Sequence, residues 1–199
     1  TVLYIVAFIF ALPPVTRMFA DGIGRRKTLI VAGLLFAVAM TLQALAANIA
    51  YPASKWVLLS GRVLLGIPVA FSVTTSPMFL TEISPKAHRG FIGGLFQFAL
   101  MVFFVGSAAI QLAIKTAAPT ASYQYGVWWM VPVGLLVSLF AYSSTETPYF
   151  LLMKGNEEEA KKVLYYLREG ESADVIQEEF ERMKKEDRET KDLGKATYK

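Results

Sequence analysis

The sequence predicts an all-α, polytopic membrane protein with five transmembrane helices and a charged helical tail. Of its 199 residues, 54% are hydrophobic and only 18% are charged, and the mean hydropathy is +0.43, outside the usual range of soluble domains. The charges are unevenly distributed. Residues 1–152 carry 9 basic and 3 acidic side chains, whereas residues 153–199 carry 11 and 13. We therefore expect a membrane domain over 1–152 and a water-soluble segment over 153–199.

Five apolar runs define the expected spans, because a bilayer core requires about 20 apolar residues per helix. Arg17 near the end of the first run and Arg62 in the third are their only charged residues. Five buried helices of a large soluble protein would show polar faces over this many turns, so that alternative is disfavoured. The runs are residues 1–20, 28–50, 56–81, 91–114 and 126–145.

The distribution of basic residues between alternate loops predicts the orientation. One set of loops contains only Lys55 and Lys115. Because basic loops stay in the cytoplasm, we expect residues 153–199 to be cytoplasmic and the loops at Tyr51 to Lys55 and Lys115 to Tyr125 to be external. The other, basic set consists of Arg17, Arg25, Arg26, Lys27, Lys86 and Arg89.

The charged tail should form two helices. Asn156 is the expected N-cap of the first, with three glutamates in its first turn, and Ser172 can cap the second. Two interpretations remain open: the helices lie against the inner face of a membrane protein, or they form a solvated linker. The apolar residues at helical spacing are Ala160, Val163, Leu164 and Leu167, then Ile176, Phe180 and Met183.

The composition also argues against several classes of function. With no cysteine and one histidine, the sequence offers no thiol catalyst and no thiolate or multi-histidine metal site. We therefore expect no enzyme activity, no metal and no cofactor. The basic residues lie in short loops and form no continuous stripe, which disfavours nucleic-acid binding. Because the chain starts inside an apolar run and without Met, we interpret it as a fragment.

Four motifs place charges at helix ends. Asp21 to Lys27 is a turn with two glycines, which can also be read as a basic loop that anchors a span. In Pro77 to Gly90, Glu82 and Arg89 bracket one turn and can pair. Arg62, within Gly61 to Gly66, needs a partner or must snorkel to the surface. The fourth motif, Thr145 to Leu152, places Glu146 after the last span.

These motifs resemble those of the sugar porter family of the major facilitator superfamily. The family patterns D-R-x-G-R-R, G-R-x-x-x-G, P-x-Y-x-x-E-x-x-P-x-x-x-R-G and P-E-S-P-R are similar to the four segments above, in the same order. The resemblance implies a partial major facilitator fold. The five spans would be the second to sixth of twelve, followed by the start of a cytoplasmic helical domain. The partners would be the bilayer, the first helix and the C-terminal half of the same transporter.

The sequence departs from the family patterns at several positions. Gly22 replaces a basic residue, Phe79 replaces the tyrosine, and Thr145 and Tyr149 replace a proline and an arginine. The pair Pro13 and Pro14 should kink the first span.

The resemblance implies alternating-access transport of a monosaccharide, such as the hexose glucose, in the plasma membrane. Gln97 matches a sugar-contacting position, although it could instead bond to a neighbouring helix. Arg62 matches a coupling position, but these residues do not distinguish uniport from proton symport. The alternatives are a facilitator for another small polar or ionic solute and a non-transporting sensor or truncated paralogue. The implied inner-gate charge network is Asp21, Arg25, Arg26, Glu82, Arg89 and Glu146.

Overall fold

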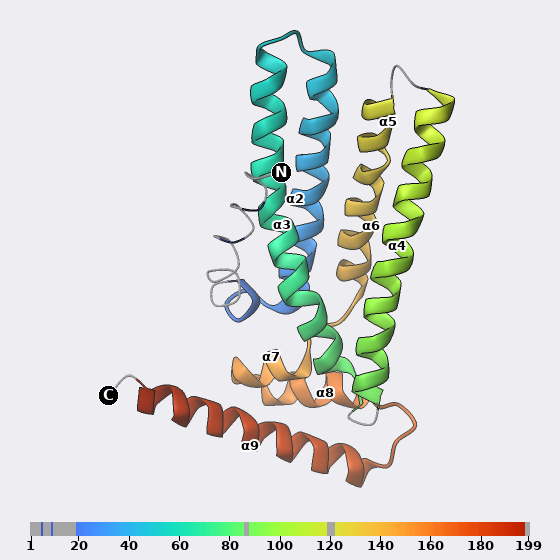
Figure 1. Cartoon of the computed structure of the whole chain (residues 1–199). Coiled ribbons are helices and arrows are strands. Elements are labelled where there is room, and N and C mark those ends of the chain that lie inside the picture. The colour runs from blue at the N-terminus through green and yellow to red at the C-terminus, as the bar shows by residue number, and fades with distance from the viewer. Residues whose placement is uncertain (1–4, 6–8, 10–18, 86–87, 119–121, 198–199) are drawn as a thin grey trace. The chain divides into compact units, whose positions relative to one another are not determined.

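The computed structural model describes residues 5, 9, 19–85, 88–118 and 122–197, with side chains up to residue 189. Every regular element among these residues is a helix (Figure 1). The chain divides into two compact units, Thr1–Ser144 and Thr145–Lys199.

The first unit contains the membrane helices. Four segments are long and apolar enough to cross a bilayer: Arg25–Asn48, Ala53–Ile83, Arg89–Ala117 and Ser122–Ser143. They correspond to the second to fifth predicted runs. The first predicted run, with Pro13, Pro14 and Arg17, lies almost entirely outside the described residues. The elements are α2 (Arg25–Leu45), η2 (Ala46–Asn48), α3 (Ala53–Ile83), α4 (Arg89–Ala117), α5 (Ser122–Trp128) and α6 (Met130–Ser143).

Helices α2, α3 and α4 begin before their apolar runs, and α3 and α4 also end beyond them. Lys115, which the sequence interpretation placed in a loop, lies in the last turn of α4. Hydropathy marks only the hydrocarbon core of about 30 Å, whereas the bilayer with its headgroups is about 40–45 Å thick. At 1.5 Å per residue, α4 is about 43 Å long and can continue through the headgroups.

The last span is broken into two helices, which the sequence interpretation did not foresee. Helix α5 ends at Trp128 and α6 begins at Met130. Pro132 has no backbone N–H to donate to the carbonyl of Trp128, and its ring clashes with that carbonyl in a straight helix. Pro132 was therefore a visible signal for the break.

Helices α2 and α6 touch through their backbones. A Cβ added at Gly134 would lie 2.8 Å from the Gly33 carbonyl oxygen and 2.9 Å from the Phe36 ring. The Ser138 hydroxyl donates to the carbonyl of Ile30 over 3.0 Å. Small residues and hydroxyl bonds are typical of contacts between membrane helices.

The small-residue positions of α4 behave differently. Gly90, Gly93 and Gly94 lie near the start of α4, at the spacing that often allows close helix approach in membranes. A Cβ at any of them would meet no atom within 4 Å. Among the described residues, the glycines at close approaches lie in α2, α3, α5 and α6 instead, at positions such as Gly33 and Gly61.

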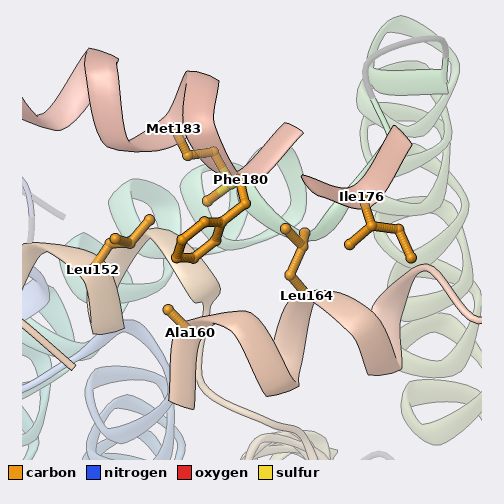
Figure 2. Packing of buried hydrophobic residues seen from close by; sticks show 6 residues of the cluster. All are labelled: Leu152, Ala160, Leu164, Ile176, Phe180 and Met183. Atoms are coloured by element: carbon orange, nitrogen blue, oxygen red, sulfur yellow. The ribbon is translucent and has the colours of Figure 1, made fainter. Parts of the chain in front are cut away.

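The second unit is a small helical body with its own core. It contains α7 (Pro148–Met153), α8 (Glu157–Leu167) and α9 (Ala173–Thr197). Five of the apolar residues predicted to line the two tail helices pack in one cluster, so the tail has an apolar core of its own (Figure 2). Asn156 is the N-cap residue of α8, as expected, although its side chain makes no capping bond. The core consists of Leu152, Ala160, Leu164, Ile176, Phe180 and Met183.

The boundary between the units lies earlier than the predicted boundary after residue 152. It falls between Ser144 and Thr145. The reason is α7, which has no charged side chain and therefore falls on the membrane side of a boundary drawn from the charge distribution. Leu152 of α7 instead packs with the core of the second unit. The Thr147 hydroxyl accepts a hydrogen bond from the Phe150 N–H and caps α7.

We predict that Gly134→Ala destabilises the membrane unit. The added methyl group would overlap the α2 backbone, and overpacking of this kind costs about 1–3 kcal/mol. The control is Gly106→Ala in α4, where a Cβ meets nothing within 4 Å and helix propensity favours alanine by about 0.5–1 kcal/mol. Thermal unfolding of the purified protein in detergent compares the two variants. Equal melting temperatures would contradict the close contact.

Candidate functional site

Three cations open α2. Arg25, Arg26 and Lys27 occupy its first turn, and that turn contains no acidic residue. The N-terminus of a helix carries a partial positive charge, so cations at this position are unfavourable by themselves. Groups from other parts of the chain must therefore compensate the positive charges of these three side chains.

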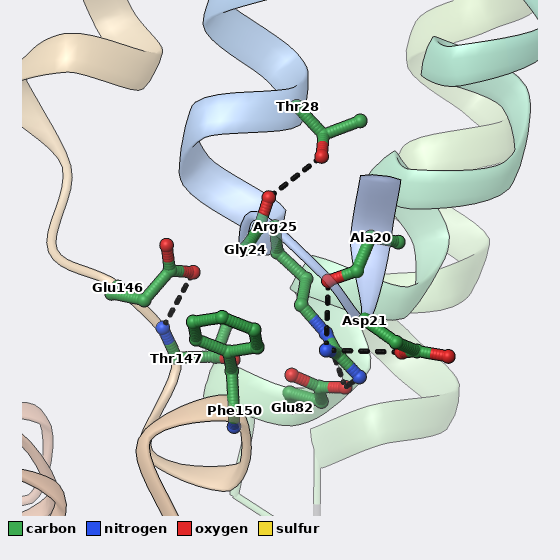
Figure 3. Close-up of polar contacts among 9 residues, drawn as sticks. All are labelled: Ala20, Asp21, Gly24, Arg25, Thr28, Glu82, Glu146, Thr147 and Phe150. Atoms are coloured by element: carbon green, nitrogen blue, oxygen red, sulfur yellow. Dashed lines mark hydrogen bonds and ion pairs between the residues drawn. The ribbon is translucent and has the colours of Figure 1, made fainter. Parts of the chain in front are cut away.

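Arg25 is compensated by carboxylates on both sides. Its guanidinium lies 3.1 Å from a carboxylate oxygen of Asp21 and 3.1 Å from one of Glu82. Its Nε donates to the same Glu82 oxygen over 3.2 Å, and Nη1 donates to the carbonyl of Ala20 over 3.0 Å (Figure 3). Arg25 thus connects the start of α2 with the end of α3.

Burial indicates which carboxylate matters more. Arg25 is only 2% exposed, and a buried charge must be paired. The Glu82 side chain is 14% exposed and that of Asp21 is 41% exposed. Because solvent weakens exposed ion pairs, the bond to Glu82 is the stronger of the two.

Arg26 binds a different helix end. Its Nε donates to the carbonyl of Ala141 over 3.2 Å and Nη2 to that of Tyr142 over 2.5 Å. The guanidinium also lies 5.4 Å from the centre of the Tyr142 ring. The last carbonyls of a helix have no partner within it, so Arg26 satisfies the C-terminus of α6 and complements its negative dipole.

The expected pair between Glu82 and Arg89 is not among the ion pairs of the described residues. Glu82 binds Arg25 instead, and Arg89 is exposed at the start of α4. Helix α3 stays regular to Ile83, which brings Glu82 to the start of α2. Glu146 belongs to the second unit, where its carboxylate accepts from the Thr147 N–H over 3.2 Å.

Gln97 lies on α4 and is exposed. No hydrogen bond of its amide is found among the described residues, so the alternative of a bond to a neighbouring helix is not observed there. Two other glutamines make such bonds. Gln43 donates to the carbonyl of Gly61 over 3.4 Å, and Gln111 donates to that of Gly126 over 2.7 Å.

Arg62 is half-buried in α3. Within the described part of the chain it makes no hydrogen bond or ion pair, although it lies close enough to the Tyr123 phenol to interact with it electrostatically. The hydroxyl of Thr74, one helical turn from Ala70 on the same helix, donates to the carbonyl of Ala70 over 2.8 Å.

Sequence analysis missed a cavity of about 250 Å³ in the membrane unit. Its walls come from α2, α3 and α6, and only the proximity of these helices in space reveals it. Among the described residues, no group of three or more histidines, cysteines or acids could hold a metal. The cavity is lined by Arg26, Leu29, Ser76, Phe79, Val137, Phe140, Ala141 and Ser144.

Curated relatives are sugar transporters of plants, bacteria and animals. Sugar transport protein 13 of Arabidopsis thaliana is 33% identical over 79% of this chain and 28% of its own length. Facilitated glucose transporter protein 1 of Caenorhabditis elegans is 31% identical over 84% and 32%. Glucose transporter GlcP of Staphylococcus epidermidis is 28% identical over 73% and 30%. The chain thus spans about a third of the length of these relatives.

Solved structures show the same fold. The major facilitator proton:xylose symporter XylE, bound to 6-bromo-6-deoxy-D-glucose, matches 97% of this chain and 43% of its own length with a TM-score of 0.86 and 18% identity. A partially occluded inward-open conformation of XylE from E. coli matches with a TM-score of 0.82 and 19% identity over 92% of this chain and 44% of its own. At this identity the likeness concerns the fold alone.

The expected partial major facilitator fold is confirmed by these structures. The model of the family described as "Sugar (and other) transporter" matches residues 3–199. With apolar helices long enough to span a bilayer several times, the chain is a multi-pass integral membrane protein that belongs to this sugar transporter family.

Proposed function

We propose that the transporter containing this chain carries a monosaccharide, most simply a hexose such as glucose, by alternating access. Family membership over residues 3–199 supports a solute transporter. The observation that carries the substrate class is the amide of Gln97 within residues 91–105 of α4, which are otherwise apolar.

The position of Gln97 makes its amide costly without a ligand. It lies about 12 Å along α4 from Arg89 at 1.5 Å per residue, within the depth of the hydrocarbon core. Polar groups at that depth need partners from protein, water or substrate. An amide can both donate to and accept from sugar hydroxyls, which suits an uncharged polyol better than an anion.

The charge network would act as the gate. Asp21, Arg25 and Glu82 hold the start of α2 to the end of α3, and we infer that this contact differs between the two access states. Only an interaction that changes between states can shift their equilibrium. Arg26, Arg89 and Glu146 would belong to the same network, and Arg62 would be a coupling residue at the third span.

Orientation and location follow the same proposal. The end of the bundle with Asp21, Arg25 and Glu82, together with residues 153–199, faces the cytoplasm, and the membrane is the plasma membrane. A further helix and a second helical half complete the solute pathway, as the greater length of the relatives suggests.

We expect Gln97→Leu to weaken sugar binding without much loss of stability. One or two hydrogen bonds to sugar would be lost, on the order of 1–3 kcal/mol. The control is Gln43→Leu, which removes a bond between α2 and α3 and should lower the melting temperature but not the affinity. Binding and thermal unfolding are measured on the purified transporter. If Gln97→Leu leaves the hexose affinity unchanged, Gln97 is not part of the binding site. If the transporter takes up phosphate or organic ions but no hexose, the proposed substrate class is wrong.

A double-mutant cycle tests the gate. Arg25→Ala and Glu82→Ala should each slow hexose uptake, and the double variant should be little slower than the worse single variant because the residues share one bond. Arg89→Ala combined with Glu82→Ala should instead give nearly additive losses. Uptake rates are normalised to surface expression. The reverse pattern would assign Arg89, rather than Arg25, as the partner of Glu82.

Labelling of single cysteines tests the orientation, since this chain contains none. Tyr51, which is 80% exposed, should react as Tyr51→Cys with an impermeant reagent on intact cells. Glu158→Cys should react only after permeabilisation, and the cysteine-free transporter provides the background. Protection of Tyr51→Cys in intact cells would reverse the proposed orientation.

A further inference from the structure

The break in the last span leaves polar backbone groups inside the membrane. Helix α5 ends at Trp128, so its last four carbonyls lack partners within the helix. The carbonyl of Tyr125 accepts from the Trp129 N–H over 3.3 Å. In hydrocarbon, such broken helices are tolerated only where neighbouring groups satisfy the freed backbone.

Gln111 of α4 supplies one of these partners. Its Nε2 donates to the carbonyl of Gly126, the next along α5, over 2.7 Å. About two turns before Gln111 on α4, the ring of Phe103 lies 6.2 Å from the ring of Trp129, with a tilt of 32° between them. Helix α4 is therefore attached to the other helix at its break.

The absence of a side chain at Gly126 makes this bond possible. An added Cβ there would overlap the Gln111 amide oxygen and lie 3.1 Å from both Cδ and Nε2. Gly126 does not have a positive φ, so alanine fits its backbone. An alanine at this position would therefore act only by displacing the amide.

Little else fixes α4 within the described part of the chain. None of its residues is buried, whereas α2 buries eight residues against its neighbours. Gln97 lies about four turns from Gln111 on the same helix, on nearly the same side at about 100° per residue. A rotation or tilt of α4 about its anchor would therefore move the Gln97 amide directly.

We propose that Gln111 is a positioning residue for Gln97: its bond to the Gly126 carbonyl holds α4 in the orientation that presents the Gln97 amide to substrate. The proposal rests on the proposed function. It adds that the affinity for sugar depends on the Gln111 amide, which does not contact the sugar.

The first experiment measures hexose binding and uptake by the intact transporter. Gln111→Leu and Gly126→Ala should each raise the KM for hexose about 5- to 10-fold and change the maximal rate less than twofold. In the Gln97→Leu background, Gln111→Leu should add less than a twofold further rise, because the positioned group is gone. Gln43→Leu is the matched control: it removes another interhelical amide bond and should leave KM unchanged.

A second measurement needs no substrate. Spin labels at Met101→Cys on α4 and Val73→Cys on α3, both more than half exposed, report the distance between the helices. Gln111→Leu should shift or broaden the distance distribution, and Gln43→Leu should leave α4 as ordered as in the parent. An unchanged distribution in Gln111→Leu would overturn the anchoring role whatever the solute is.

The two failures are distinguishable. If Gln97→Leu weakens hexose binding but Gln111→Leu only lowers the melting temperature, the bond is merely structural and the proposal fails while the function stands. If Gln111→Leu disorders α4 but no variant alters hexose binding, hexose is not the substrate at Gln97. The proposal that Gln111 controls the affinity for sugar is then also wrong. Fully additive KM effects of Gln97→Leu and Gln111→Leu would also overturn the proposal.

Discussion

Water is excluded from the hydrocarbon core of a bilayer, so each polar group in a membrane helix must find its partner in the protein or in a ligand. The contacts of the membrane unit follow from this constraint. Arg26 of α2 satisfies the last carbonyls of α6, and Gln43 bonds across to α3. Gln111 satisfies a carbonyl at the break before α6. Gln97 has no such partner among the described residues, which is why we propose it as a contact for a soluble ligand.

The packing of the second unit is driven by apolar contacts rather than by polar pairs. Its helices bury one face each around Leu164 and Phe180, as expected when the alternative is exposure to water. Even there the charged pair is buried: Arg168, which is 5% exposed, binds both carboxylate oxygens of Glu179 at 2.9 and 3.0 Å. A paired, bidentate geometry makes that burial tolerable.

Hydropathy predicted the second to fifth spans, because the length of an apolar run is a local property of the sequence. The family resemblance placed Asp21, Arg25 and Glu82 in one charge network. Neither predicted that Glu82 binds Arg25 rather than Arg89. Which arginine pairs with Glu82 depends on how the end of α3 packs against the start of α2. The separation of these residues along the chain does not predict that packing. The pairing of Gly33 with Gly134 was hidden for the same reason, whereas Pro132 did mark the break in the last span.

The contact between α2 and α6 also has a consequence for how the protein is made. Arg26 and its acceptor Ala141 are 115 residues apart in the chain, so at about 5–20 residues per second the ribosome needs roughly 6–23 s to supply the acceptor. During that delay Gly33 and the Arg26 guanidinium of α2 lack their contacts with α6. The hairpin of α2 and α3, joined by Gln43, is complete much sooner. The order of synthesis therefore lets the hairpin of α2 and α3 form before α6 is available to pack on α2.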